Sequence, residues 1–275
     1  MAKITAAEVN KLRKATGAGM MDCKKALIEA NGDFDNAVEE IRKKGQAIAN
    51  KRADRDATEG VVLSKVTADQ TSGAILVLNC ETDFVAINAD FIGFATSILD
   101  KAIESKATTL DELNAIELDG RKIADLVAEK SGVIGEKIEL ARFASVTAGM
   151  VVPYIHPGNK LATMVAYNKA FDVQAGRDVA MQIAAMAPVS VDKDNVPADV
   201  IEKELEIGRE QARLDGKPEA MLDKIAQGKL GKFFKENTLM QQVFVKDGKA
   251  TVEAYLKSVD AEVKVNSFER FSLNA

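Results

Sequence analysis

The chain has 275 residues, of which 47% are hydrophobic and 29% are charged, and its formal net charge at pH 7 is −5. This length allows two or three domains with a sizeable buried core, and the composition is that of an ordinary soluble protein. No apolar run approaches the roughly 18 residues of a membrane span, and the N-terminus lacks the apolar segment of a secretion signal. We therefore expect a cytoplasmic protein that does not bind a membrane.

The small number and the spacing of the histidine and cysteine residues argue against several kinds of catalytic and metal site. Cys23 and Cys80 show neither a pairing pattern nor metal-ligand spacing, which favours a reducing compartment. His156, the only histidine, lies in a His-Pro-Gly-Asn segment typical of a solvated hairpin turn. No phosphate-loop, zinc-protease or calcium-loop motif occurs. We expect no catalytic residue, no metal and no cofactor, and an enzyme that uses carboxylates in a core cleft remains one alternative.

The charge is unevenly distributed. Residues 1–55 contain 12 basic and 8 acidic residues, whereas the remainder contains 25 and 34. The basic segment has neither interleaved aromatic residues nor a recognised nucleic-acid motif, so we expect no direct nucleic-acid binding. A basic first domain could instead contact an acidic protein surface.

Residues 1–44 predict three short helices. Their apolar residues at helical spacing are Val9 and Leu12, then Cys23, Ala26, Leu27 and Ala30, then Phe34, Ala37, Val38 and Ile41. This pattern is similar to a ubiquitin-associated three-helix domain, and a charged helical extension or linker follows at 43–59, so the first domain is expected at 1–55. Met20 and Met21 follow a glycine-containing bend, and they either form an adaptable contact surface or fill the small core.

A first α+β subdomain is expected at 56–147. Strands are predicted at 61–66 and 74–78, joined by a polar turn, with a further strand at 137–147. A helix beginning near Asn88 has one apolar face, and another helix lies within 113–129. The residues of that apolar face are Phe91, Phe94, Ala95, Ile98 and Ala102.

The same order of hairpin, loop and helix recurs from residue 148. A second hairpin is predicted at 150–155 and 161–167, followed by a helix with Val179, Ile183 and Met186 facing inward. We therefore expect an α+β core of two similar subdomains with antiparallel sheets. The second subdomain is expected at 148–187 and, after an insertion, at 231–275, with a helix near 252–257 and a final strand near 262–271.

The insertion at 188–230 predicts an antiparallel helical hairpin that projects from the core. A charged helix carries apolar residues on one side. The chain reverses at 214–218, and a second helix with its own apolar stripe follows. The stripes consist of Ile201, Leu205 and Ala212, then Met221, Leu222 and Ile225.

Thr82-Asp83-Phe84-Val85 lie between the end of an apolar strand and the helix that begins near Asn88. An aromatic ring beside a carboxylate, at the tip of a strand-to-helix loop, is typical of a contact site rather than of a core. The alternative is a capped helix start in which Phe84 folds back as a staple. The second subdomain has Ala170-Phe171-Asp172 in its corresponding loop, so the sequence predicts only one such site.

Two segments resemble the bacterial elongation factor Ts family: LRKATGAGMMDCKKAL at 12–27 and NCETDFV at 79–85. The layout of the remaining chain is similar almost to its end. The resemblance implies a translation elongation factor that binds EF-Tu·GDP, dislodges Mg²⁺ and promotes release of GDP so that GTP can bind. It also implies that the insertion is the coiled-coil motif of the family.

The resemblance further implies roles for individual residues. Thr82, Asp83, Phe84 and Val85 would enter the GTPase domain of EF-Tu and dislodge its Mg²⁺. Leu12, Arg13, Met20, Met21 and Lys24 would bind a peripheral helix of that domain, and the hairpin that contains His156 would contact a second domain of EF-Tu.

The sequence is compatible with more than one assembly and with a second function. A homodimer, or a 2:2 complex with EF-Tu, is compatible with the sequence. The chain ends at Ala275, whereas longer family members continue into a C-terminal helical module, so we expect that module's contact to be absent. The alternative function is that of a non-enzymatic adaptor with a ubiquitin-associated-like domain.

Overall fold

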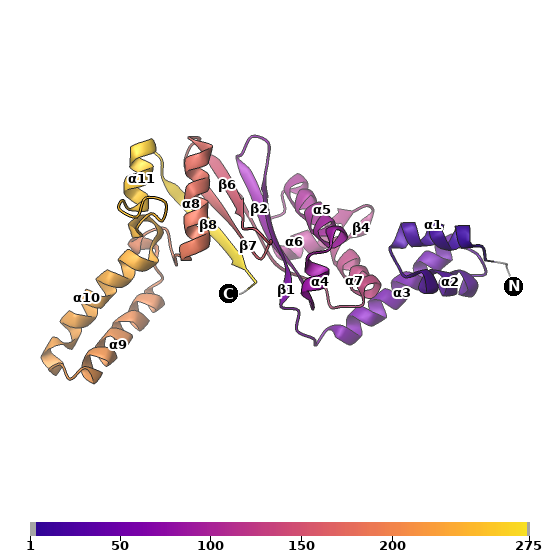
Figure 1. Cartoon of the computed structure of the whole chain (residues 1–275), viewed down its shortest axis with the longest axis horizontal. Coiled ribbons are helices and arrows are strands. Elements are labelled where there is room, and N and C mark those ends of the chain that lie inside the picture. Colours follow the sequence, from indigo (N-terminus) through magenta and orange to yellow (C-terminus); the bar gives the residue numbers. More distant parts are fainter. Residues whose placement is uncertain (1–3, 274–275) are drawn as a thin grey trace.

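The computed structural model describes residues 4–273. It places a three-helix bundle at one end of an elongated molecule and a helical hairpin at the other, with a mixed α+β core between them (Figure 1). The predicted mixed α+β class is confirmed. Within the described residues, none of the helices combines the length and the apolar character that crossing a membrane requires.

The N-terminal bundle consists of α1 (Ala6–Thr16), α2 (Met20–Glu29) and α3 (Phe34–Arg52). The Thr5 hydroxyl accepts a hydrogen bond from the Glu8 N–H, and the Glu8 carboxylate accepts one from the Thr5 N–H, so a capping box starts α1. Most of the predicted linker is helical, because α3 continues past the bundle and packs against α7 (Ile123–Ile134) of the core. The two helices cross closely at Gly45 and Gly132.

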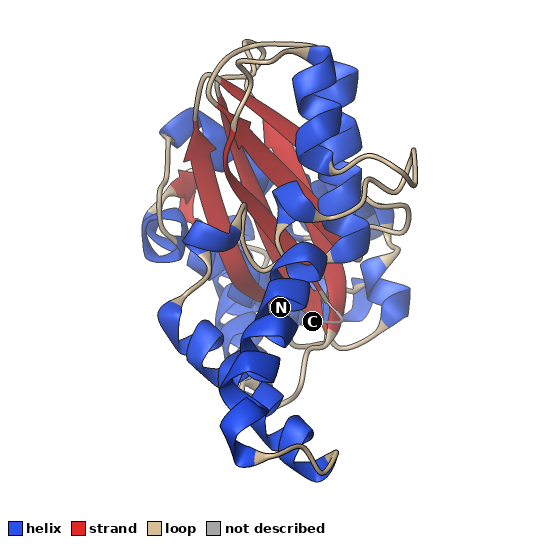
Figure 2. Ribbon diagram, turned by 90° about the vertical axis from the view of Figure 1, so that its left-hand side faces the viewer, coloured by secondary structure: helices blue, strands red, loops and turns tan. Residues whose placement is uncertain are grey.

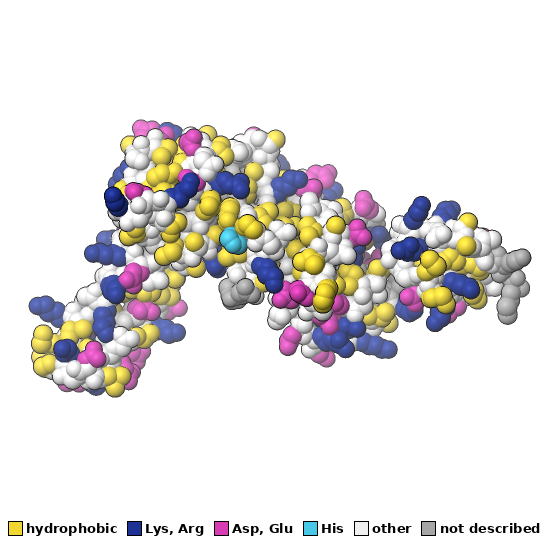
Figure 3. All heavy atoms as spheres, in the orientation of Figure 1, with side chains coloured by type: hydrophobic (Ala, Val, Ile, Leu, Met, Phe, Trp, Pro, Cys, Tyr) yellow, Lys and Arg dark blue, Asp and Glu magenta, His cyan; other side chains and the backbone are white. Residues whose placement is uncertain are grey.

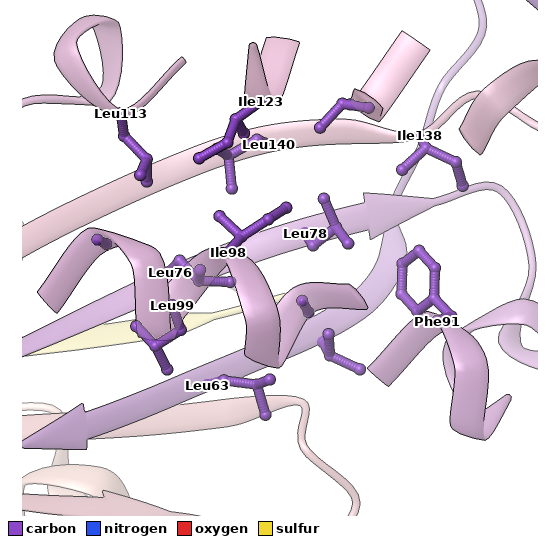
Figure 4. Packing of buried hydrophobic residues seen from close by; sticks show 14 of the residues in the cluster. Leu63, Leu76, Leu78, Phe91, Ile98, Leu99, Leu113, Ile123, Ile138 and Leu140 are labelled. Carbon is purple, nitrogen blue, oxygen red and sulfur yellow. The ribbon is translucent and has the colours of Figure 1, made fainter. Parts of the chain in front are cut away.

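The first sheet has the strand order β1-β2-β5 and is antiparallel throughout. Its strands are β1 (Glu59–Val66), β2 (Ser72–Cys80) and β5 (Glu139–Thr147). One face is covered by α5 (Ala89–Ser105), α6 (Leu110–Ala115) and α7, and a small ribbon forms from β3 (Glu117–Leu118) and β4 (Arg121–Lys122). Figure 4 shows Leu76 and Leu78 of β2 packed beneath Ile98 of α5. The predicted apolar face of α5 is confirmed, with Phe94 only partly buried.

The second sheet repeats this arrangement with the order β6-β7-β8. Its strands are β6 (Met150–Ile155), β7 (Leu161–Tyr167) and β8 (Val265–Ser272), covered by α8 (Val173–Met186), η2 (Leu239–Gln241) and α11 (Val252–Val259). Val179 and Ile183 are buried as predicted, but Met186 is 46% exposed. It is the last residue of α8, and Ala187 then turns the chain in a left-handed conformation (φ 45°).

The two sheets pack face to face, so the core has four layers in the order helices, sheet, sheet and helices (Figure 2). Ile75 and Val77 of β2 face the second sheet, while Leu76 and Leu78 face α5. Both faces of β2 are therefore buried, which explains its continuous apolar run.

The projecting hairpin consists of α9 (Ala198–Leu214) and α10 (Glu219–Asn237), preceded by η1 (Lys193–Asn195). Gly208 of α9 lies directly against Ala226 of α10. The prediction that Met221 belongs to the buried stripe is wrong, because the buried residues of α10 are Leu222, Ala226 and Leu230 and Met221 is 47% exposed. The helix α10 continues to Asn237, beyond the predicted end of the hairpin.

Candidate functional site

The segment after β2 presents two large apolar side chains to solvent. Residues Asp83–Ala86 form one helical turn, α4, in place of the predicted loop. Phe84 is 79% exposed and Ile87, three residues further on, is 74% exposed. Residues at this spacing are neighbours on a helical surface, so the two side chains form one apolar projection. The alternative in which Phe84 folds back as a staple is wrong.

The other side of the α4 turn is anchored in the core. Ala86 is buried and Val85 packs against the cluster beneath α5. The Ala86 N–H donates to the Thr82 carbonyl at 3.2 Å, and the Ile87 N–H donates to the Asp83 carbonyl at 3.1 Å. Asn88 then caps α5 by accepting from the Asp90 N–H at 2.8 Å. Phe84 is therefore exposed on a supported turn rather than on a free loop.

The residues just before α4 are held by the carboxylate of Glu136. Glu136 accepts hydrogen bonds from the N–H groups of Glu81 (3.1 Å) and Thr82 (3.0 Å) and from the Thr82 hydroxyl (2.6 Å). The Thr82 side chain is thus engaged within the protein, while Asp83 is exposed beside Phe84. Neither Glu136 nor Ile87 was singled out by sequence analysis.

Glu81 connects this segment to the end of α3. Its carboxylate accepts from Arg52 at 2.7 Å, from Arg55 at 3.1 Å and from the Lys137 N–H at 2.6 Å. Burial alone would raise the pKa of Glu81, but these hydrogen bonds and the positive charges outweigh it and lower the pKa to about 2. Glu81 therefore stays ionised at neutral pH.

The N-terminal bundle carries a second exposed surface. Met20 and Met21 begin α2 and are 55% and 63% exposed, so they do not fill the core. Arg13 and Lys24 are exposed as well. Ile28, which sequence analysis did not single out, lies two turns after Met21 on α2 and is 49% exposed.

Leu12 differs from the other predicted contact residues of the bundle. Its side chain is completely buried and packs in the bundle core, as its helical stripe with Val9 indicates. A partner cannot touch it while the bundle is folded, so a direct contact by Leu12 is excluded.

The turn between β6 and β7 lies at the same edge of the core as α4. His156 is exposed there (Figure 3), and its Nδ1 lies 3.0 Å from the Tyr154 hydroxyl. Lys160 pairs with Glu59 at 2.8 Å, and Glu59 is the strand partner of Cys80. The hydrogen bond to Glu59 raises the pKa of Lys160, and the charge of Asp83 adds to this effect. The structure thus brings the β6–β7 turn near Asp83, while the bundle surface lies apart from both.

Comparison with known proteins gives a consistent result along the whole chain. A model of the family described as elongation factor TS matches residues 81–275. The elongation factor Ts of Christiangramia forsetii is 52% identical over 275 residues, covering 99% of this chain and 100% of the relative. That of Porphyromonas gingivalis is 53% identical over 274 residues, covering 99% of each chain.

A more distant relative agrees over the same extent. The elongation factor Ts of Chlorobium phaeobacteroides is 46% identical over 288 residues and covers all of both chains. The match includes the bundle, the α4 turn and the projecting hairpin, so it does not rest on one shared module. This chain belongs to the elongation factor Ts family.

Proposed function

We propose that the α4 turn is the element with which this chain, a nucleotide-exchange factor for EF-Tu, displaces Mg²⁺ and GDP from its partner. A member of this family is a non-catalytic exchange factor, so its task is to favour an open nucleotide pocket rather than to make or break a bond. The observation that carries the proposal is the 79% exposure of Phe84 on a turn anchored in the core.

A small displacement in the partner is sufficient for release. A GTPase holds its nucleotide with a Mg²⁺ ion that requires near-ideal octahedral geometry at roughly 2.0–2.1 Å. Inserting an aromatic ring beside a ligating element would disturb that geometry, and the exposed carboxylate of Asp83 would act on the same polar surroundings. Burying one such ring is worth roughly 1.5–3 kcal/mol, or about one to two decades of affinity.

Ile87 extends this apolar contact. Its exposure of 74% leaves about three quarters of its surface available for burial in a partner. Together the two side chains could supply roughly 3–6 kcal/mol. Coupling is reciprocal, so the factor by which this protein weakens GDP binding is also the factor by which GDP weakens its own binding. Rebinding of nucleotide and Mg²⁺ then releases the exchange factor.

Two further contacts would supply the remaining affinity. The bundle, a ubiquitin-associated-like module in this proposal, would bind a helix of the GTPase domain through Met20 and Met21, with Arg13 and Lys24 facing acidic groups. The β6–β7 turn with His156 would contact a second domain of EF-Tu. All these surfaces lie on one chain, so a 1:1 complex in the cytoplasm can make each contact without a homodimer or a 2:2 complex.

Replacing Phe84 by alanine tests the proposal. Stopped-flow release of fluorescent GDP from EF-Tu should slow by about one to two decades, with an unchanged melting temperature because the ring is exposed. Leu214→Ala is the matched control, since Leu214 is 82% exposed at the tip of the hairpin. An unchanged release rate for Phe84→Ala would place the displacing element elsewhere.

A further inference from the structure

We propose that Glu136 is a positioning residue for nucleotide exchange, which fixes the start of the α4 turn so that Phe84 is presented in one orientation. The inference rests on the proposed role of the α4 turn. Glu136 follows α7, where Gly135 turns the chain in a left-handed conformation (φ 82°). That turn directs Glu136 towards the segment between β2 and α4.

The need for a positioning residue follows from the length of α4. A helix of four residues is not stable by itself. Thr82 occupies its N-cap position, but its hydroxyl donates to Glu136 and makes no capping bond to the turn. The orientation of the turn must therefore be set by tertiary contacts.

Glu136 provides contacts of the required kind. One of its oxygens accepts from the two consecutive N–H groups of Glu81 and Thr82, and the other accepts from the Thr82 hydroxyl. Hydrogen bonds to an ionised acceptor are stronger than those between neutral groups. Three donors within two residues are thus fixed immediately before α4 begins.

The contact is reciprocal and extends to the N-terminal bundle. The Glu81 carboxylate accepts from the Lys137 N–H, so segments 81–82 and 136–137 exchange carboxylate-to-backbone hydrogen bonds in both directions. Glu81 also holds Arg52 at the end of α3 and Arg55 just beyond it. The turn that carries Phe84 is consequently fixed relative to both α7 and α3.

Fixing the turn in advance affects exchange more than folding. A turn that is mobile in the free protein must be ordered when it enters the partner, and ordering one residue reduces affinity by about tenfold. This loss of affinity weakens the complex in which Phe84 is inserted into the partner, and that complex is the one that releases GDP.

The test compares Glu136→Ala, Glu136→Gln and the double variant Glu136→Ala/Phe84→Ala in the GDP-release assay. We expect Glu136→Ala to slow release by about tenfold. Glutamine keeps an acceptor for the two N–H groups, so Glu136→Gln should recover most of the rate. Glu139→Ala, which removes an exposed carboxylate on β5 that pairs with Lys137, is the control and should behave as wild type.

The double variant separates positioning from a general loss of structure. If Glu136 acts by orienting Phe84, Glu136→Ala slows release less in the Phe84→Ala background than in the wild-type background. Only the contacts of Asp83 and Ile87 remain to be lost when the Phe84 ring is already absent. An equally large slowing in both backgrounds, or a wild-type rate for Glu136→Ala, would overturn the inference. Normal release by Phe84→Ala would instead overturn the proposed role of the α4 turn, so the two failures are distinguishable.

Discussion

Substituting Gly132 by alanine tests the crossing that joins the N-terminal bundle to the core. A Cβ atom on Gly132 would lie 2.1 Å from the Cα of Gly45 and 2.9 Å from its carbonyl carbon and oxygen. Ordinary contacts begin at about 3.4 Å. Since all three atoms belong to the backbone, no rotamer change can relieve the overlap, and α3 must move away from α7.

The same substitution at the facing glycine, Gly45, provides a matched control. A Cβ atom on Gly45 would meet the Cα and carbonyl oxygen of Glu129 at 3.6 Å, which is ordinary contact. Overpacking costs roughly 1–3 kcal/mol, whereas replacing a helical glycine by alanine recovers roughly 0.5–1 kcal/mol. We expect Gly132→Ala to lower the free energy of unfolding by about 1–2 kcal/mol and Gly45→Ala to leave it unchanged or raise it by up to about 1 kcal/mol.

Urea unfolding of the two variants measures this difference, and limited proteolysis of segment 53–58, between α3 and β1, reports whether the bundle has loosened. Gly132→Ala should be cleaved there faster than wild type, and Gly45→Ala should not. Equal stability of the two variants, or greater damage by Gly45→Ala, would refute the described crossing.

Two further expectations concern the bundle and Glu81. Met20→Asp with Met21→Asp should weaken EF-Tu binding in a pull-down titration and leave the melting temperature within a few degrees. Leu12→Ala should instead lower the free energy of unfolding by about 2–5 kcal/mol. Unchanged stability of Leu12→Ala, with a large loss of stability in the Met20 and Met21 variant, would contradict the assignment of Leu12 to the core. The lowered pKa of Glu81, about 2 against an ordinary 4.5, means that its contribution is present above pH 4.5 and is lost as the pH falls towards 2. That contribution is at most about 3 kcal/mol, so the gap in melting temperature between wild type and Glu81→Gln should narrow over this range, and a constant gap would show that Glu81 does not act through its charge.

Periodicity predicted those parts of the fold in which one face of an element is buried. The apolar face of α5, from Phe91 to Ala102, repeats often enough to fix both its type and its orientation. The run in β2 from Ala74 to Leu78 predicted a strand, but it did not show what covers each face. A continuous apolar run fits a helix layer or a second sheet equally well, so the packing of the two sheets could not be foreseen.

Short elements and helix ends were predicted less well. The α4 turn has too few residues for any period, so Ile87 could not be placed beside Phe84 from the sequence. Met186 and Met221 both satisfied the apolar pattern, yet both are exposed. Met186 lies at the end of α8, and Met221 lies one residue before the buried stripe of α10 begins at Leu222.

Leu12 shows how two kinds of inference can conflict within one segment. The resemblance covers residues 12–27 as a block and does not distinguish side chains that face outward from those that face inward. Helical spacing with Val9 places Leu12 in the core, and the structure agrees with the spacing. Among the residues implied by the block, those outside the stripe, such as Met20 and Met21, are the exposed ones.

Glu136 could not have been found by either route, because its hydrogen-bond partners lie 54 and 55 residues earlier in the chain. An exposed aromatic ring gains little from its own subunit, so its orientation has to be imposed by other residues. Those residues are polar here, because the segment before α4 leaves backbone N–H groups that a neighbouring carboxylate can bind. Phe84 can be recognised as an unusual residue from its local sequence, whereas the residues that hold its turn in place become visible only when β2, α7 and α3 are brought together.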